Sequence, residues 1–352
     1  MTGEELAGAV SKVTTGDGSE FDIVETYHRL LAEDEDLTMA VAAIEALIAL
    51  LGHTTSSTVM ETLDIVKAQA DRLKRSSTNP IPLTAGTDLF QQYLLRSLKQ
   101  STGPRSGKEP ATGSGLDSFD ETRQHLLRNG RLFAARAKAA RDAIAVRGSR
   151  YVGLGSVVLT AGGSRTVKKL LLKAAERHIE TNGSPDFKVI YVLDGSRDSE
   201  PAVKELRERG VPVAPVDPAA VAHVLQAGRV DMVFVGAEVV VQNGGAISRM
   251  GTYQLAQLTK AVNKPLYVVA ETHKFVRLYP LGQNDLGRCG IKQNILDFST
   301  SADSGAKEKP AEVSESQIPV DYTPADLITS IITEHGVKMP SAVYEMLLDI
   351  YT

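Results

Sequence analysis

The chain of 352 residues contains no tryptophan, and only 5% of its residues are aromatic. Proteins that hold single-stranded nucleic acids stack the bases on aromatic side chains. The charge is also nearly balanced, with a formal net charge of -4, so the basic surface that neutralises phosphates is missing. We therefore expect no direct nucleic-acid partner.

Cysteine is almost as scarce. The single Cys289 excludes an intrachain disulfide and is typical of a reducing compartment. It falls in a stretch expected to be a loop, where a free structural thiol is favoured over a nucleophile. The acidic N-terminus is unlike a signal peptide, and the longest apolar run, residues 37–51, is too short to span a bilayer. These features predict a cytosolic protein without a membrane partner.

The sequence also lacks the usual signatures of metal and cofactor sites. None of its seven histidines forms an H-x-x-x-H or H-x-H pair, so no metal site is predicted. Neither the G-x-G-x-x-G fingerprint nor a Walker A loop is present. Dinucleotide and nucleoside triphosphate binding are disfavoured, and we expect no cofactor.

Residues 1–148 are predicted to form a helical N-terminal domain. Ile44, Leu47, Ile48 and Leu51 lie on one face of a helix that Asp36 can cap and Gly52 follows. Further helices are expected at about 55–75, 89–98 and 119–146. The glycine-, proline- and serine-rich stretch at about 101–118 is predicted to be a flexible loop.

The last of these helices is rich in arginine. Between residues 121 and 150, arginine and lysine far outnumber acids, and Arg128 and Arg131 are among them. Such a run can be a solvated helix face. That interpretation is favoured, and a surface for an acidic or phosphorylated partner is the alternative.

Residues 149–352 show an α/β pattern. Short, nearly continuous apolar runs predict buried parallel strands at about 156–160, 188–193, 211–214, 232–236 and 265–270. Helices are expected between them, at about 166–180, 200–209, 218–227 and 252–263. This repetition predicts a Rossmann-like, doubly wound, mostly parallel sheet. A polar loop at about 299–317 precedes an expected helix from residue 321, with Thr323 as its cap.

Polar, cationic turns follow three of the predicted strands. The first contains Gly162, Gly163, Ser164 and Arg165, where two glycines and a helix N-terminus can cradle a phosphate. A tight βα turn explains this motif equally well. The second turn contains Arg197.

The last of these turns, residues 233–253, is the most informative segment. We interpret it as a strand, a glycine-rich turn and a helix, with four candidate ligand-binding residues at the strand end: Glu238, Asn243, Gly244 and Arg249. An ordinary Asn-Gly turn is the alternative. Together the three turns predict a pocket for a small phosphorylated molecule. One carboxylate without a second acid, base or nucleophile gives little support for catalysis.

The same segment carries a resemblance to a known family. Residues 233–253, 264–280, 320–329 and 340–352 closely resemble the regulatory subunits of eukaryotic translation initiation factor 2B, and residues 40–44 and 86–90 match more weakly. The α type fits best, because residues 274–280 are α-like. The family includes isomerases of methylthioribose 1-phosphate and ribose 1,5-bisphosphate. The resemblance implies a helical N-terminal and a Rossmann-like C-terminal domain.

It also implies how the predicted pocket is used. The isomerases have a cysteine at the position of Gly162 and an aspartate at that of Glu238, so we expect no isomerase activity and no catalytic residue here. Their lysine corresponds to Arg249, and a cation near Arg197 also matches. Phosphate binding is therefore expected to persist, with a sugar phosphate or nucleotide monophosphate as ligand. An active sugar-phosphate isomerase is the rival hypothesis.

The partners follow from the resemblance as well. The family's complex is the guanine-nucleotide exchange factor for initiation factor 2, and exchange belongs to its ε subunit. The resemblance implies a regulatory homodimer that joins the β, γ, δ and ε subunits and helps sense the phosphorylated α chain of initiation factor 2. Arg128 and Arg131 are the candidate contacts for that chain.

Overall fold

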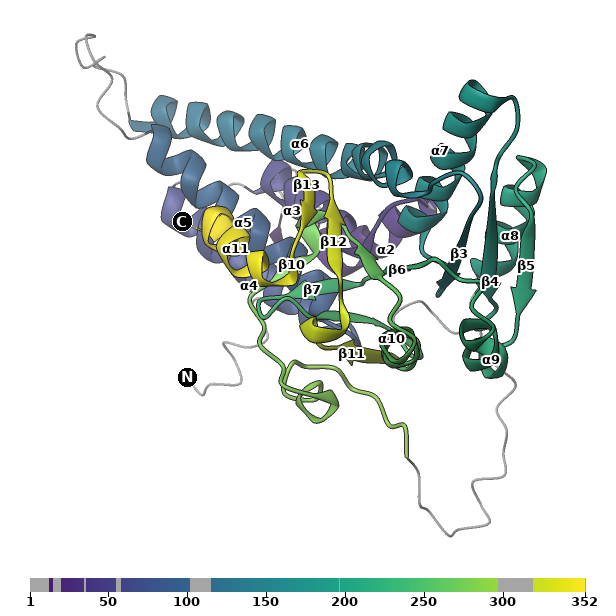
Figure 1. Cartoon of the computed structure of the whole chain (residues 1–352). Helices are drawn as coiled ribbons and strands as arrows, with labels where there is room; N and C mark the ends of the chain where they lie inside the picture. Colours follow the sequence, from purple (N-terminus) through teal and green to yellow (C-terminus); the bar gives the residue numbers. More distant parts are fainter. Residues whose placement is uncertain are drawn as a thin grey trace. The chain divides into compact units, whose positions relative to one another are not determined.

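The computed structural model describes residues 13–14, 20–34, 36–54, 58–101, 115–195, 197–296 and 319–351 (Figure 1). Their contacts form two compact units, one up to Lys138 and one from Ala139 to Asp349. This division falls inside a long helix, α6 (Gly115–Gly148), whose last residue coincides with the predicted boundary at 148/149. Each unit is described by itself below.

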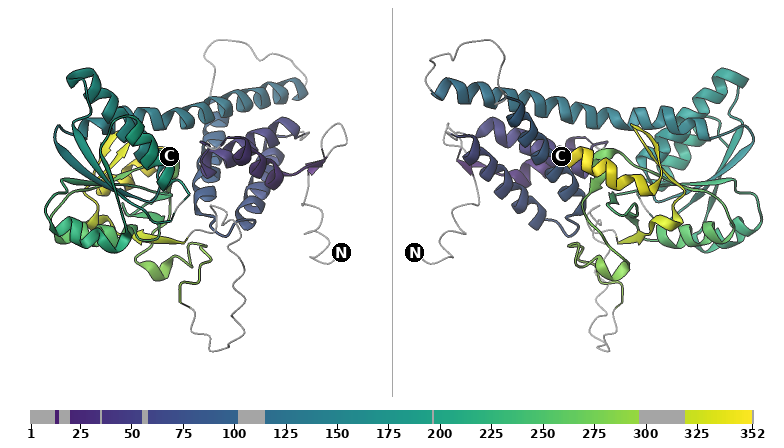
Figure 2. Two further views of the ribbon diagram at one scale, coloured as in Figure 1. Left: turned by 90° about the vertical axis from the view of Figure 1, so that its right-hand side faces the viewer. Right: turned by 60° about the vertical axis from the view of Figure 1, so that its left-hand side comes forward.

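The first unit is helical, as Figure 2 shows from two sides. Its elements are β1 (Val13–Thr14), β2 (Glu20–Phe21), α2 (Ile23–Glu33), α3 (Met39–His53), α4 (Val59–Arg75), α5 (Ile81–Ser101) and the greater part of α6. Helix α3 supplies more of its buried core than any other helix, including Ile44 and Leu47. A Cβ atom on Gly86 of α5 would lie 2.4 Å from the Ala40 carbonyl oxygen of α3, so this glycine permits close helix packing.

Three predictions about this unit need correction. Helix α3 begins after Thr38, whose hydroxyl accepts the Val41 amide, and Asp36 is not its cap. Helix α5 is much longer than the expected 89–98. Helix α6 already begins at Gly115, because its sequence continues the helical pattern toward the N-terminus. The rest of the predicted loop, residues 102–114, lies outside the described residues.

The second unit is built on a seven-stranded sheet in the order β13-β12-β9-β6-β3-β4-β5. The strands are β3 (Ser156–Ala161), β4 (Phe187–Val192), β5 (Val213–Val216), β6 (Met232–Gly236), β9 (Leu266–Val269), β12 (Ser330–Thr333) and β13 (Gly336–Lys338). All pairs are parallel except β12 with β13. The mostly parallel Rossmann-like fold is confirmed. Strand β5 forms one margin of the sheet and contains Pro215, which has no amide hydrogen.

Helices cover both faces of this sheet. They are α7 (Arg165–Asn182), α8 (Ser199–Glu208), α9 (Val221–Gln226) and α10 (Thr252–Ala261), with single turns η1 (Ser149–Tyr151) and η2 (Pro218–Ala220). Apolar residues of α7 and α8, such as Leu170 and Leu206, pack on the strands in one core. Helices α9 and α10 contact each other (Figure 1), and right-handed crossovers place them on the opposite face.

A second, four-stranded sheet was not predicted. It has the order β10-β7-β8-β11 and contains β7 (Val239–Val241), β8 (Ala246–Arg249), β10 (Phe275–Val276) and β11 (Val320–Thr323). Residues 233–253 therefore include a hairpin between β6 and α10, and the interpretation as one strand, one turn and one helix was wrong. The error arose because β7 is wholly buried and shows no alternation to mark it as a strand of another sheet.

The predicted helix from residue 321 was also wrong. That segment is strand β11, antiparallel to β8, with Tyr322 opposite Ile247. Pairing with β8 overrides the local capping pattern of Thr323 and Pro324. The chain then continues through η7 (Ala325–Leu327), β12 and β13, η8 (Pro340–Ala342) and α11 (Val343–Tyr351). Two further short helical turns of the described residues are η3 (Thr272–Lys274) and η4 (Gln283–Asp285). The predicted loop at 299–317 lies outside the described residues.

Among the described residues, no helix has the length and apolar character needed to cross a membrane.

Candidate functional site

The site lies where the strand order reverses, at the carboxyl end of β3. Ligands of open α/β sheets bind at such a switch point. The turn after β3 needs its two glycines, because Gly162 has φ 82° and Gly163 has φ 60°. Ser164 then caps α7, its hydroxyl accepting the Val167 amide at 3.3 Å, and Arg165 is the first helical residue.

The neighbouring strand, β6, ends in a glycine for a steric reason. A Cβ atom on Gly236 would lie 2.3 Å from the Ser164 Oγ. Only a glycine there lets the first turn of α7 come so close to the end of β6. The predicted first turn and the end of β6 are thus packed directly against each other.

A small cavity of about 60 Å³ opens beside this turn. Its polar side chains are those of Asp194, Arg249, Thr252 and Gln254, and the remaining walls, which include Gly162, are largely apolar. The volume corresponds to about two water molecules at ~30 Å³ each, whereas ligand pockets usually exceed ~300 Å³. The cavity therefore accommodates a small polar group, and a whole sugar phosphate requires the walls to open.

The charges at the cavity are already paired with each other. The Arg249 guanidinium lies 3.6 Å from the Asp198 carboxylate, and Asp194 accepts a hydrogen bond from the Ser199 hydroxyl at 2.8 Å. Burial, with the nearby Asp194 carboxylate, raises the pKa of Tyr191 to about 12. Tyr191 is therefore a neutral hydrogen-bonding group at physiological pH. An incoming phosphate would compete with Asp198 for the Arg249 guanidinium.

The predicted residues do not all meet at this cavity. Gly162 and Arg249 line it, whereas Arg197 is exposed in the loop before α8. Glu238 is half-buried just after β6, and its backbone amide donates to the Ile247 carbonyl. Its role as a ligand-binding residue stays a prediction.

Asn243 and Gly244 lie in the β7–β8 hairpin turn and are not among the residues that line the cavity. The Asn243 side chain donates to the Pro280 carbonyl at 2.7 Å and to the Tyr322 hydroxyl at 2.9 Å, and accepts the Gly245 amide at 3.1 Å. A Cβ atom on Gly244 would lie 2.3 Å from the Pro340 carbonyl oxygen. In this geometry both residues stabilise the hairpin turn of the second sheet.

A buried charge cluster next to the site escaped the sequence analysis. Glu271, only 1% exposed, follows β9 and accepts a hydrogen bond from the Thr166 hydroxyl at 2.9 Å. It also pairs with Lys274 at 2.9 Å and with Arg141 of α6 at 3.5 Å. Lys274 donates in turn to the Ala237 carbonyl after β6. The cluster connects the ends of β6 and β9 with the first turn of α7. In the sequence, the only feature that indicates it is an acidic residue directly after an apolar strand.

Burial and charge set the protonation of this cluster. Burial alone raises the pKa of Glu271, but Lys274 and then Arg141 pull it below its usual range, so the carboxylate is ionised. Burial lowers the pKa of His273 to about 4, so this imidazole is neutral at physiological pH. The cluster is a fixed ionic brace and carries no free proton donor near neutrality.

The N-terminus of α10 is occupied by a protein carboxylate. Asp321 of β11 accepts the amides of Gly251 and Tyr253 at 2.7 and 3.0 Å. Burial raises the pKa of Asp321 to about 6. These two amides are therefore already engaged by the protein itself.

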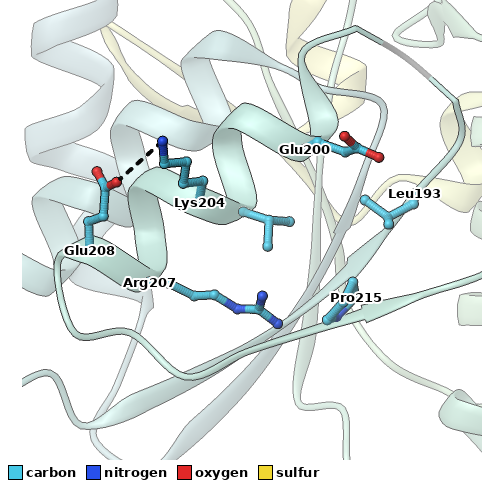
Figure 3. Close-up of a pocket in the computed structure, with 7 residues that line it drawn as sticks. Leu193, Glu200, Lys204, Arg207, Glu208 and Pro215 are labelled. Carbon is cyan, nitrogen blue, oxygen red and sulfur yellow. Dashed lines mark ion pairs between the residues drawn. The ribbon is translucent and has the colours of Figure 1, made fainter.

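Another hollow lies elsewhere in the second unit. Figure 3 shows it between α8 and β5, with a volume of about 500 Å³. Arg207 donates there to the Val213 carbonyl at 2.8 Å, and Lys204 lies 3.9 Å from Glu208. Both of these cations thus have partners within the protein. Within the described part of the chain, no group of three or more His, Cys, Asp or Glu side chains could hold a metal ion.

The candidate partner-binding residues lie on α6, in the first unit. Arg128 and Arg131 are both exposed. One helical turn separates them, so they share a face of the helix. No ion pair involves either of them among the described residues.

The fold and the site define a protein with a helical unit and a Rossmann-like unit whose switch-point turn is a tight glycine cradle. The chain belongs to the initiation factor 2 subunit family, which matches residues 33–340. It is 28% identical over 343 residues to the translation initiation factor eIF2B subunit alpha of Dictyostelium discoideum, covering 96% of this chain and 100% of that protein. It is 30% identical over 237 residues to the ribose 1,5-bisphosphate isomerase of Archaeoglobus fulgidus, covering 65% and 68%. The crystal structure of eIF2B beta from Chaetomium thermophilum superposes with a TM-score of 0.71 at 18% identity, covering 94% of this chain and 92% of that one.

Proposed function

We propose that the chain is a regulatory, non-catalytic α-type subunit of the guanine-nucleotide exchange factor for initiation factor 2. The observation that carries this proposal is the end-to-end similarity to an eIF2B alpha subunit, of which the match covers 100%. The similarity to the isomerase covers only 68% of that enzyme. Such a subunit acts in the cytosol through the proteins it assembles with.

The residues at the switch point support the absence of isomerase chemistry. The family's isomerases need a thiol in the turn after the first strand, and that position is Gly162. The chain has one cysteine, Cys289, which is not among the residues lining the cavity beside Gly162, and burial raises the pKa of its thiol. A turnover assay with methylthioribose 1-phosphate and ribose 1,5-bisphosphate tests this point; measurable ketose formation by the purified chain would favour the rival enzyme.

Assembly is the direct test of the subunit role. The chain is proposed to form a homodimer and to join the β, γ, δ and ε subunits. Native mass spectrometry of the protein alone should give a dimer, and co-expression with the other subunits should give a larger complex. A monomer that captures none of them would overturn the proposal.

The proposal includes a contact with the phosphorylated α chain of initiation factor 2. Arg128 and Arg131 are exposed cations on one face of α6, and arginine forks suit phosphorylated partners. Charge reversal at both positions in the assembled complex should weaken binding of the phosphorylated chain. A matched reversal at Arg229, an exposed arginine of the second unit, should not. Equal affinity in all three complexes would exclude this surface.

The cavity beside Gly162 is proposed to bind a sugar phosphate or nucleotide monophosphate through Arg249. Ligand binding stabilises the folded state by mass action, so a thermal-shift series with these compounds tests it. The shift should disappear in Arg249→Gln. No shift at millimolar concentrations would contradict this part of the proposal and leave the subunit role intact.

A further inference from the structure

A second cationic hollow lies in the second unit, apart from the cavity beside Gly162. It has a volume of about 320 Å³ and is lined by Arg147, Arg150, Tyr151 and Val337. It shares none of these residues with the first cavity. We call it the two-arginine hollow. Its walls come from the last turn of α6, the following turn η1 and the edge strand β13.

The two arginines are not neutralised by the protein. They are three residues apart, which brings their side chains to the same side of consecutive turns. Both are exposed, and neither takes part in an ion pair within the described residues. Of the nearby acids, Asp142 pairs with Lys169 and Glu334 accepts hydrogen bonds from Thr272. A cation in the last turn of a helix offsets the helix dipole, but Arg150 lies beyond the helix end and is not explained in this way.

The base that holds these arginines is rigid. A Cβ atom on Gly148, which directly follows Arg147, would lie 2.2 Å from the Leu170 Cδ1, so the end of α6 packs closely onto α7. The Tyr151 ring lies against the Tyr267 ring with centroids 5.5 Å apart. The aromatic wall and the end of the helix are therefore fixed before any ligand arrives, which lowers the entropic cost of binding.

We propose that the two-arginine hollow binds a phosphoryl group, carried either by a phosphorylated residue of a protein partner or by a small phosphate ester. Guanidinium groups bind phosphate oxygens through paired, charge-assisted hydrogen bonds. Two guanidinium groups on this fixed base, opposite a tyrosine, form a positively charged cleft that is large enough for a phosphoryl group. The site is independent of the ligand proposed for the cavity beside Gly162.

The absence of tryptophan in the chain permits a direct assay. Tyr151→Trp places the sole tryptophan in the wall of the hollow, and its fluorescence is followed during titration with inorganic phosphate and with a short phosphoserine peptide. Saturable binding is expected with both probes. Arg147→Gln and Arg150→Gln should each weaken it by about tenfold, the loss of one charge-assisted contact. Arg229→Gln and Arg249→Gln should leave it unchanged.

A second measurement avoids any change to the aromatic wall. Equilibrium dialysis of labelled phosphate with the native chain should show one more bound equivalent than with the Arg147→Gln, Arg150→Gln double variant. Tighter binding of the peptide than of phosphate assigns the hollow to phosphorylated proteins, and equal binding assigns it to small phosphate esters. The site would be refuted if the native chain and the double variant bind the same number of phosphate equivalents. It would also be refuted if neither arginine substitution changes the tryptophan titration.

Discussion

The ionic brace around Glu271 makes the sharpest prediction about stability. This carboxylate is almost completely buried and compensates two cations, Lys274 and Arg141. Glu271→Gln keeps an oxygen that can accept from Thr166, but it removes the carboxylate charge that pairs with both cations. The substitution therefore isolates the ionic contribution of the brace.

The expected loss is large compared with the stability of the protein. Removing one partner of a buried ion pair costs about 3–5 kcal/mol, because an uncompensated charge remains in the interior. We expect the lower end of this range, about 3 kcal/mol, since the hydrogen bond to Thr166 can persist. A typical domain has a free energy of unfolding of roughly 5–15 kcal/mol, so Glu271→Gln should shift its urea midpoint visibly.

Urea unfolding followed by far-ultraviolet circular dichroism measures the effect. The matched control is Glu176→Gln, which removes a carboxylate from a partly exposed pair with Lys173 at 2.9 Å; such surface pairs contribute at most about 1 kcal/mol. Adding Lys274→Met to Glu271→Gln should restore part of the loss, because one stranded cation is removed. If Glu271→Gln costs no more than the control, the brace does not stabilise the fold and the reasoning is wrong.

Three further predictions follow from single features. Since burial raises the pKa of Asp321 to about 6 from 3.8, the folded state holds this proton more tightly than the unfolded chain, and its stabilisation is lost as pH rises from about 4 to 6. Asp321→Asn should abolish this change in the free energy of unfolding, which amounts to at most about 3 kcal/mol over the whole pH window. Gly236→Ala should cost about 1–3 kcal/mol by collision with Ser164, and Ser164→Gly should relieve it in thermal melts; an unchanged melting temperature would refute the contact. If the cavity binds a phosphate, Asp198→Asn should raise the affinity for phosphate severalfold in calorimetric titrations, because the competing carboxylate charge beside Arg249 is removed. Weaker binding would instead indicate that Asp198 contacts the ligand.

The parallel core of the second unit could be predicted from local sequence. Strands such as β3 and β6 are continuous apolar runs because helices cover both of their faces. The second sheet could not be predicted in this way. Strand β11 exists because it pairs with β8, whose residues precede it by about seventy positions in the register Asp321 to Ser248, and no local pattern carries that information. Where a capping motif and a distant partner compete, the distant hydrogen bonds decide.

The site was predictable to the extent that strand ends meet at one edge of a parallel sheet. That rule places Gly162 at the switch point, whereas Arg249 reaches the same cavity from β8 of the second sheet. It gives no indication of which side chains neutralise each other, so the pairing of Arg249 with Asp198 could not be predicted. It also failed for Asn243, because the hairpin directs that side chain to Tyr322. Strand order limits where a site lies, and only the packed side chains decide its chemistry.

The two margins of the large sheet bear on how copies of this chain can meet. At one margin, Pro215 has no amide hydrogen to donate to an additional strand. A proline on an edge strand disfavours the pairing of strands from different molecules that leads to fibrils. At the other margin the outermost strand spans only 3 residues, too few to template a long ribbon. Association by extending this sheet is therefore disfavoured at both ends. Contacts between copies of this chain are therefore expected to use side chains and not strand pairing at this sheet.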